Sequence, residues 1–255
     1  MKIRKHIPNL LTCLNIVVGC YACILALDGD YRGAMTAIII AAVFDFADGF
    51  AARLLNAFSP IGKDLDSLAD IVSFGVAPGM IIFDFLDRIQ NMVDWNYAIT
   101  GKLFVLVALI VPVFSALRLA VFNNDNRQTS SFIGLPVPAH ALLWASLVYV
   151  LSYAMERTAV SGLLPQIISF RFPGMSPLFI LIFVSFLAIG SSFLLVSKIP
   201  MFSMKIKSPA WKGNETRYIL VVAAVVFIGC FGFFGVTLTI LFYILLSCFC
   251  TCSRH

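Results

Sequence analysis

Long apolar runs constrain the fold of this chain more than any other feature of its sequence. Of its 255 residues, 60% are hydrophobic and only 12% are charged. A helix needs about 20 predominantly apolar residues to cross a bilayer, and within lipid only helices and closed barrels satisfy their own backbone hydrogen bonds. Short polar segments separate such runs, which cover a first stretch ending at Leu27 and then about 33–58, 63–85, 103–122, 139–154 and 177–195.

The last apolar run, residues 218–250, is too long for one span and barely long enough for two. A hairpin near Gly232 and Gly235 would bring the total to eight spans, and six is the alternative. We therefore predict an all-α, polytopic transmembrane helical bundle in three parts. These parts are a catalytic membrane domain over 1–197, a basic cytoplasmic loop over 198–217 and a C-terminal transmembrane hairpin over 218–255.

The net charge of +5 could indicate nucleic-acid binding, but the distribution of the charges argues against it. Lysines and arginines fall in short segments between the apolar runs, and the sequence has no basic stripe with interleaved aromatic residues. The positive-inside rule places the basic N-terminus and the basic segment 198–217 in the cytoplasm. That segment either only sets the topology or also attracts anionic lipid head groups. We expect a multi-pass protein of a prokaryotic cell membrane, surrounded by membrane lipids and with no nucleic-acid partner.

Four aspartates stand out within the otherwise apolar sequence. Asp45 and Asp48 are three residues apart, and Asp66 and Asp70 are four apart, so each pair shares one face of a helix. A carboxylate at membrane depth is costly and normally marks a functional site. A purely structural role for the four buried carboxylates is the alternative.

Pro60 and Gly62 lie between the two pairs and are expected to break the chain into two antiparallel helices. Helices joined in this way would point the four carboxylates at one another near the cytoplasmic face of the membrane. So many carboxylates would repel strongly unless cations lay among them. Oxygen-only ligands suit Mg²⁺ or Mn²⁺, so the spacing predicts a site for two divalent ions that handles a phosphate ester.

The same stretch resembles the signature of the CDP-alcohol phosphotransferase family. In that signature Asp-x-x-Asp-Gly-x-x-Ala-Arg is followed, after eight residues, by Gly-x-x-x-Asp-x-x-x-Asp. The matching residues of this chain are Asp45, Asp48, Gly49, Ala52, Arg53, Gly62, Asp66 and Asp70. The resemblance implies that Asp45, Asp48 and Asp66 bind the metal ions. It also implies that Asp70 is catalytic, either contacting a metal or deprotonating the hydroxyl of the incoming alcohol.

Four residues of the signature are candidates for binding the nucleotide and its phosphates. Gly49 and Ala52 lack bulk, so a nucleotide could lie close against the helix backbone. Gly62 could do the same, or it could only break the helix. Arg53 offers a planar fork for phosphate oxygens, unless it forms an ion pair with a motif aspartate.

Asn9 and Thr12 complete the candidates on the nucleotide side. They belong to a Pro-Asn-x-x-Thr element, and a similar element recurs in the family near this place. Their alternative roles are helix capping by Asn9 and hydrogen bonding between helices.

Within the family, the chain most resembles the membrane-embedded phosphatidylserine synthases. The resemblance rests on residues 66–78, 117–123 and 134–139, although the family usually has Arg where this chain has Val121. Serine is a zwitterion, so its carboxylate needs a cation. Arg118 is the candidate for that contact, unless it is a structural or snorkelling arginine. Asn123 is a second candidate, unless it only caps the helix.

The resemblance implies that the chain transfers the phosphatidyl group of CDP-diacylglycerol to L-serine and releases CMP, as a homodimer. The nearest alternative uses another alcohol, such as glycerol 3-phosphate or inositol phosphate. These acceptors carry a phosphate and should require several basic residues near the site, but the sequence offers only Arg118 and Arg127. A cation transporter is an alternative of another class, but such proteins are typically built from inverted repeats, and the sequence shows no repeat.

Overall fold

The computed structural model describes residues 6–57, 59–93, 98–124, 132–159, 176–202 and 214–252, and nearly all of these are helical. The helices are α1 (Ile7–Leu27), α2 (Tyr31–Leu54), α3 (Pro60–Asp70), α4 (Ala77–Gln90), α5 (Ala98–Leu106), α6 (Ile110–Asn124), α7 (Val137–Ala159), α8 (Pro177–Val196), α9 (Glu215–Phe231) and α10 (Phe233–Cys252). A π-helical turn, Ile71–Val76, joins α3 to α4, and a 3₁₀ turn, Val107–Leu109, joins α5 to α6. Two short strands, β1 (Phe132–Ile133) and β2 (Pro200–Met201), pair antiparallel.

The predicted all-α transmembrane bundle is confirmed. Six helices of the described residues are long and apolar enough to cross a membrane, the longest being the continuous helix Pro60–Gln90. The C-terminal run forms two helices, α9 and α10, that turn at Gly232, where the hairpin was predicted. Gly232 has a φ of 57°, a left-handed conformation that glycine adopts without strain. Counting α9 and α10 as two further spans stays a prediction.

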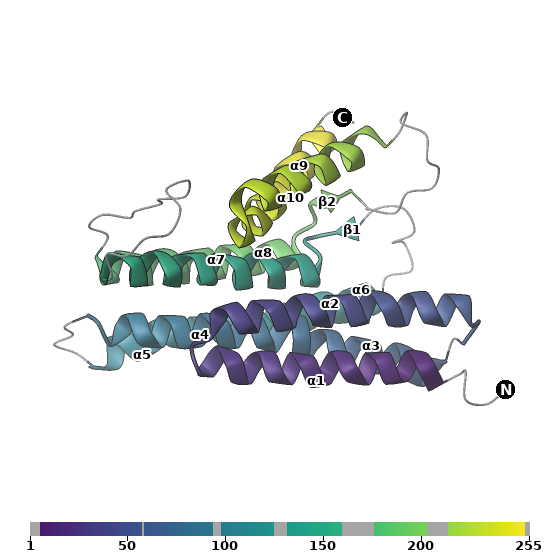
Figure 1. Cartoon of the computed structure of the whole chain (residues 1–255), viewed down its shortest axis with the longest axis horizontal. Coiled ribbons are helices and arrows are strands. Elements are labelled where there is room, and N and C mark those ends of the chain that lie inside the picture. Colours follow the sequence, from purple (N-terminus) through teal and green to yellow (C-terminus); the bar gives the residue numbers. More distant parts are fainter. Residues whose placement is uncertain are drawn as a thin grey trace.

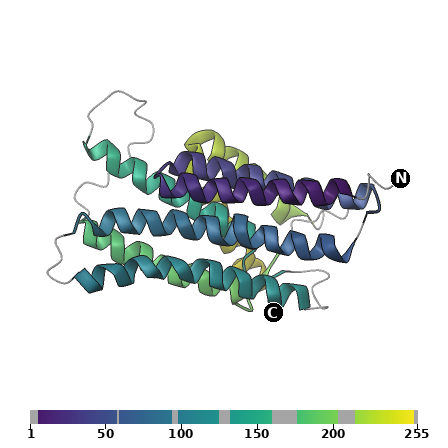
Figure 2. The same cartoon turned by 90° about the horizontal axis from the view of Figure 1, so that it is seen from below.

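The helices form a layered arrangement (Figure 1). Figure 2 shows the long helix of residues 60–90 between the α1–α2 pair and the helix of residues 98–124. Helix α7 packs against α2 and α4 on one side and against α10 on another. The α9–α10 hairpin therefore lies on the outer side of α7, at an angle to the other helices (Figure 1).

The break between α2 and α3 differs from the prediction in one respect. Gly62 does not break the chain, because it lies in the first turn of α3, which begins at Pro60. The chain instead leaves α2 at Leu55 and passes through Asn56, whose φ of 47° is left-handed. The hydroxyl of Ser59 then accepts a hydrogen bond from the backbone N–H of Gly62 at 3.0 Å and caps α3.

The segment before α7 is tied to the segment after α8. The backbone N–H of Gly134 donates to the carbonyl of Ile199 at 2.9 Å, and that of Leu135 donates to Leu194 at 3.1 Å. These bonds continue the pairing of β1 with β2. The predicted basic loop 198–217 is thus partly structured: it contributes β2, and its last residue, Arg217, lies in the first turn of α9. Residues 203–213 of that loop, and Arg127, lie outside the described residues.

A partly exposed ion pair fastens the bundle at the end away from the motif aspartates. Asp84 on α4 accepts a hydrogen bond from the hydroxyl of Tyr31 at 2.7 Å and pairs with Arg88 at 2.6 Å. A second guanidinium nitrogen of Arg88 donates to the carbonyl of Leu27 at 3.4 Å. Among the described residues this is the one ion pair, so the aspartates of the motif have no cationic side chain within salt-bridge distance.

Candidate functional site

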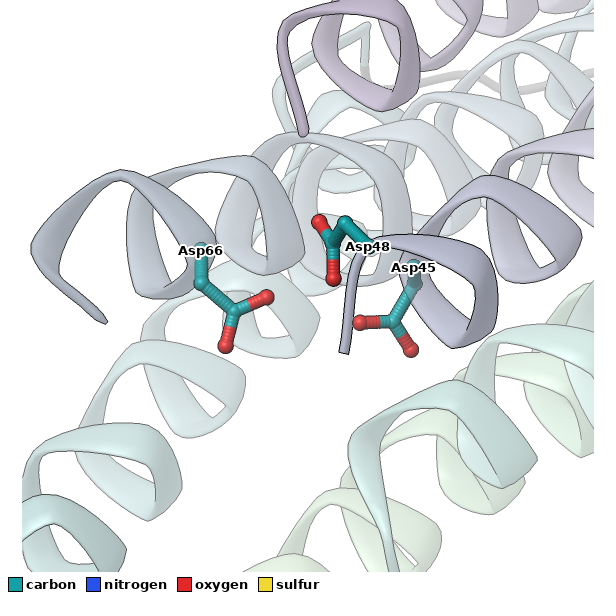
Figure 3. A group of neighbouring side chains, drawn as sticks. All are labelled: Asp45, Asp48 and Asp66. Carbon is teal, nitrogen blue, oxygen red and sulfur yellow. The ribbon is translucent and has the colours of Figure 1, made fainter. Parts of the chain in front are cut away.

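Three aspartates gather where α2 and α3 meet. Asp45 and Asp48 lie three residues apart in the second half of α2, and Asp66 lies on the next helix, α3, which packs against α1. One carboxylate oxygen from each lies within 4.8 Å of those of the other two. Figure 3 shows the three carboxylates directed toward the same space. This is the arrangement that the spacing and the intervening turn predicted for these three residues.

Asp70, the fourth aspartate, lies one turn beyond Asp66, at the last residue of α3. It is not part of the group of three, but it is close enough to interact electrostatically with Asp45, Asp48 and Asp66. Its Oδ1 atom is buried and has no hydrogen-bond partner among the described residues. The π-helical turn begins at the next residue, and such turns are frequent at functional sites. Asp70 therefore borders the three-carboxylate group from the side of the membrane interior.

The three carboxylates fit a site for a hard divalent cation. Two unit charges 4.8 Å apart repel by about 3 kcal/mol at the effective dielectric typical of proteins. No basic side chain of the described residues offsets this repulsion through a salt bridge. The donors are all carboxylate oxygens, which are the ligands that Mg²⁺ and Mn²⁺ prefer. Asp45, Asp48 and Asp66 are thus able to hold such an ion, and a metal contact of Asp70 stays a prediction.

Thr12 supports one of these carboxylates directly. Its hydroxyl lies 2.5 Å from Oδ2 of Asp48 and 3.0 Å from the carbonyl of Pro8. A hydroxyl has one proton, and an ionised carboxylate is the stronger acceptor. The structure places Thr12 against a candidate metal ligand, and its contact with the nucleotide stays a prediction.

Asn9 and Gly62 lie next to each other on α1 and α3. A Cβ atom built on Gly62 would approach Oδ1 of Asn9 to 3.1 Å and the hydroxyl of Ser59 to 3.0 Å. A side chain at residue 62 would thus crowd this corner of the site. Gly62 permits the close approach of the two helices, a role that differs from the two considered from the sequence.

Gly49, Ala52 and Arg53 form the outer side of the site on α2. A Cβ atom built on Gly49 would meet no heavy atom within 4 Å, so the space beside its backbone is open. Arg53 is exposed and its Nε donates to the carbonyl of Gly49 at 2.9 Å. It does not pair with a motif aspartate, which leaves the rest of its guanidinium group pointing to solvent-accessible space. Ala52 lies half-buried between the two.

Arg118 is a buried cation on α6. Its residue exposure is 7%, its Nε has no hydrogen-bond partner among the described residues, and its guanidinium carbon lies 5.3 Å from the ring centre of Phe122. It interacts electrostatically with Asp70 and with Tyr243 of α10. Taking a cation out of water is costly unless it is paired, so this position favours binding of an anionic ligand group.

Asn123 connects the end of α6 to the aspartate helix. Its side-chain amide donates to the hydroxyl of Ser67 at 2.9 Å, and Ser67 is the neighbour of Asp66 in sequence. Both residues chosen for the acceptor side, Arg118 and Asn123, therefore face the α3 segment that carries Asp66 and Asp70. Arg118 is buried beside Asp70, whereas Asn123 is exposed.

Two residues near the site were not among the candidates. Asn15 is fully buried on the face of α1 that carries Thr12, and its three-residue spacing from Thr12 was the available signal. Tyr243 is buried on α10, where its hydroxyl donates to the carbonyl of Phe202 at 3.1 Å. The apolar sequence of α10 did not indicate that Tyr243 would approach Arg118. His140 of α7 forms a hydrogen bond between helices, with Nε2 3.0 Å from the hydroxyl of Ser191 on α8.

Comparisons with known proteins give a consistent result. The model of the family described as CDP-alcohol phosphatidyltransferase matches residues 5–249. A CDP-diacylglycerol–serine O-phosphatidyltransferase of Helicobacter pylori is 36% identical over 138 residues, which are 53% of this chain and 54% of that protein. The protein of the same name from Mycobacterium tuberculosis is 30% identical over 223 residues, 86% of this chain and 68% of that protein.

An archaeal protein is also similar. The archaetidylserine synthase of Methanothermobacter thermautotrophicus is 32% identical over 155 residues, 60% of this chain and 61% of that protein. The match spans about half the length of the Helicobacter relative and about two thirds of the mycobacterial one.

Proposed function

The chain belongs to the CDP-alcohol phosphatidyltransferase family, and on that premise we propose that it transfers the phosphatidyl group of CDP-diacylglycerol to L-serine. The products are phosphatidylserine and CMP. The observation that carries this proposal is the group of three carboxylates within 4.8 Å. Beside it the buried Arg118, which forms no salt bridge among the described residues, lies near Asp70. The names of the relatives support the choice of serine.

In this proposal two divalent ions, Mg²⁺ or Mn²⁺, would be held by Asp45, Asp48 and Asp66. Asp70 would be a further ligand, next to Asp66. When bound, such ions neutralise the diphosphate of the substrate and stabilise the departing CMP phosphate. The protein itself holds the carboxylates at fixed positions. Thr12 holds Asp48 in place through its hydrogen bond.

The nucleotide lies against the outer side of α2. The open space beside Gly49 and the small side chain of Ala52 let the diphosphate approach the helix backbone. Arg53 contacts phosphate oxygens with the part of its guanidinium group that does not bond Gly49. Asn9 and Gly62 form the opposite corner, where a side chain at residue 62 would crowd Asn9 and Ser59.

The acceptor lies on the side of α6. Arg118 pairs with the serine carboxylate, and its desolvated surroundings strengthen that contact. Asp70 takes the proton of the serine hydroxyl as this oxygen attacks the phosphorus atom. Asn123 orients the end of α6 against α3. An acceptor with its own phosphate, such as glycerol 3-phosphate, would require more cationic side chains than the described site offers.

The aspartate end of the bundle and the N-terminus are cytoplasmic in this proposal, so the site meets a nucleotide-linked lipid and serine from the cytoplasm. The positive-inside distribution of charge supports this orientation. The membrane domain 1–197 carries the chemistry, and α10 of the hairpin segment packs against α7. The homodimer that the resemblance implies is part of the proposal.

The test is CMP release from CDP-diacylglycerol by the purified full chain in detergent, with each alcohol added in turn. Release that depends on serine and is lost in Asp70→Asn supports the proposal. Release that depends on glycerol 3-phosphate or inositol phosphate instead would support the proposed site but show that serine is not the acceptor. No release with any alcohol, although Mn²⁺ still binds, would reject the transferase and favour a cation transporter.

A further inference from the structure

Asn15 lies at the base of the aspartate site, on the buried face of α1. The same face carries Thr12, which bonds Asp48, and Gly19, which packs directly against Ser73. The backbone carbonyl of Asn15 itself accepts a hydrogen bond from the hydroxyl of Ser73 at 3.0 Å. Asn15 therefore lies one turn deeper in the bundle than the contact between Thr12 and Asp48.

The side chain of Asn15 has an unusual environment. It is 0% exposed, and neither Oδ1 nor Nδ2 has a hydrogen-bond partner among the described residues. A buried amide without partners costs free energy, and buried polar groups are almost always hydrogen-bonded in folded proteins. The neighbouring polar groups of Thr12 and Ser73 are both bonded. The amide of Asn15 is thus left without a hydrogen-bond partner among the described residues.

Asp70 provides the complementary group. It lies three residues before Ser73 on the helix that packs against α1, so it is at the depth between Thr12 and Asn15. Its Oδ1 is also buried and without a hydrogen-bond partner among the described residues. An orphan donor on α1 and an orphan acceptor on the adjacent helix are thereby placed at similar depth. One water molecule between them would satisfy both groups.

We propose that Asn15 is a positioning residue for Asp70, whose carboxylate it holds through one shared, hydrogen-bonded water molecule. The hydrogen bond fixes the direction of the second oxygen of Asp70 toward the acceptor hydroxyl. This inference rests on the proposed function, because it assigns Asn15 a part in the same transfer. Asn15 does not touch the substrates and acts only through Asp70.

The decisive variant is Asn15→Leu, which has a similar length and branching but no polar group. We expect kcat for serine-dependent CMP release to fall by about tenfold or more, because a misplaced base loses efficiency. The KM values for CDP-diacylglycerol and serine should stay within about twofold of the wild type. Mn²⁺ binding should be unchanged, and the thermal midpoint should change little, because leucine keeps the volume of the buried side chain.

Two further variants separate positioning from folding. Ser185→Ala removes another buried hydroxyl without a hydrogen-bond partner, on α8, which packs against α4 and α6 rather than α3. It should leave kcat unchanged. Asn15→Ser retains a donor and room for water, and it should recover at least about a third of the wild-type kcat.

A wild-type kcat in Asn15→Leu would overturn the inference. So would a loss of kcat that comes with an equal loss of Mn²⁺ binding or thermal stability. If Asn15→Leu does not fold, Asn15→Ser decides: full loss of kcat in a folded, Mn²⁺-binding protein contradicts the proposal. If the wild type uses another alcohol, the acceptor assignment fails separately, and Asn15 is tested with that alcohol.

Discussion

The hydroxyl of Thr12 on α1 donates a hydrogen bond to the carboxylate of Asp48 on α2, at 2.5 Å. This bond joins the first helix of the chain to the aspartate group contributed by α2 and α3. Asp48 is 5% exposed and has no cationic side chain within salt-bridge distance among the described residues. The orientation of Asp48 thus depends on Thr12, so a residue far from the motif in sequence takes part in building the site.

Thr12→Val removes this bond while keeping the shape of the side chain. A hydrogen bond to a charged group is worth about 1.5–3 kcal/mol, so the concentration of Mn²⁺ that gives half-maximal CMP release should rise by at least about tenfold. The control is Thr36→Val, because the hydroxyl of Thr36 bonds only the carbonyl of Arg32 on an exposed face of α2. Equal Mn²⁺ dependence in the Thr12 variant and the wild type would contradict the role given to this bond.

Gly49→Ala should separate stability from activity. A Cβ atom at this position meets nothing within 4 Å, and alanine is favoured over glycine in a helix by about 1 kcal/mol. The thermal midpoint should rise, whereas the KM for CDP-diacylglycerol should rise by roughly tenfold if the diphosphate lies against this backbone. Gly190→Ala on α8 is the matched control, since it also has open space. It should gain stability without a change in KM, and the same result for Gly49 would place the nucleotide elsewhere.

Arg118→Gln tests the acceptor side. Loss of a charge-assisted contact with the serine carboxylate should raise the KM for serine by about tenfold to a hundredfold and leave the KM for CDP-diacylglycerol nearly unchanged. Steady-state CMP release with each substrate varied in turn gives both values. Arg32→Gln, an exposed arginine at the other end of the bundle, serves as the control. An increase confined to the KM for CDP-diacylglycerol would assign Arg118 to the lipid substrate.

Tyr31→Phe should change stability alone. The hydroxyl of Tyr31 donates to Asp84 at 2.7 Å, and removing one hydrogen bond to this carboxylate should cost about 1 to 2 kcal/mol of stability. The thermal midpoint should fall while kcat and both KM values stay as in the wild type. Tyr21→Phe, on the exposed side of α1, should leave the midpoint unchanged. A fall in kcat at an unchanged midpoint would show that the Asp84 cluster takes part in catalysis.

The bundle and the group of three aspartates could be predicted because each rests on local spacing. Apolar runs of membrane length fix the helices, and the three-residue spacing of Asp45 and Asp48 fixes their common face. The motif also indicated that Asp66 would return to the same place. The position of the hairpin at Gly232 followed from the length of the last run and from the glycine itself.

The rest of the site depends on packing between distant segments, for which one sequence carries no local signal. Gly62 was expected to break the helix, but the left-handed Asn56 makes the turn and Ser59 caps the next helix. The π-helical turn after Asp70 lies where the chain packs closely against two neighbouring helices. Ser73 contacts Gly19 of α1, and Gly75 contacts Ser115 of α6. The contact of Asn123 with Ser67 and the approach of Tyr243 to Arg118 are likewise set by tertiary structure.

The most direct measurement is the incorporation of labelled L-serine into lipid by the purified full chain with CDP-diacylglycerol and Mn²⁺. We predict label in phosphatidylserine in a one-to-one ratio with released CMP, abolished by EDTA and restored by excess Mn²⁺. The Asp66→Asn variant should show neither product. Release of CMP without label in the lipid, or incorporation that persists in EDTA, would contradict a metal-dependent transfer to serine at Asp45, Asp48 and Asp66.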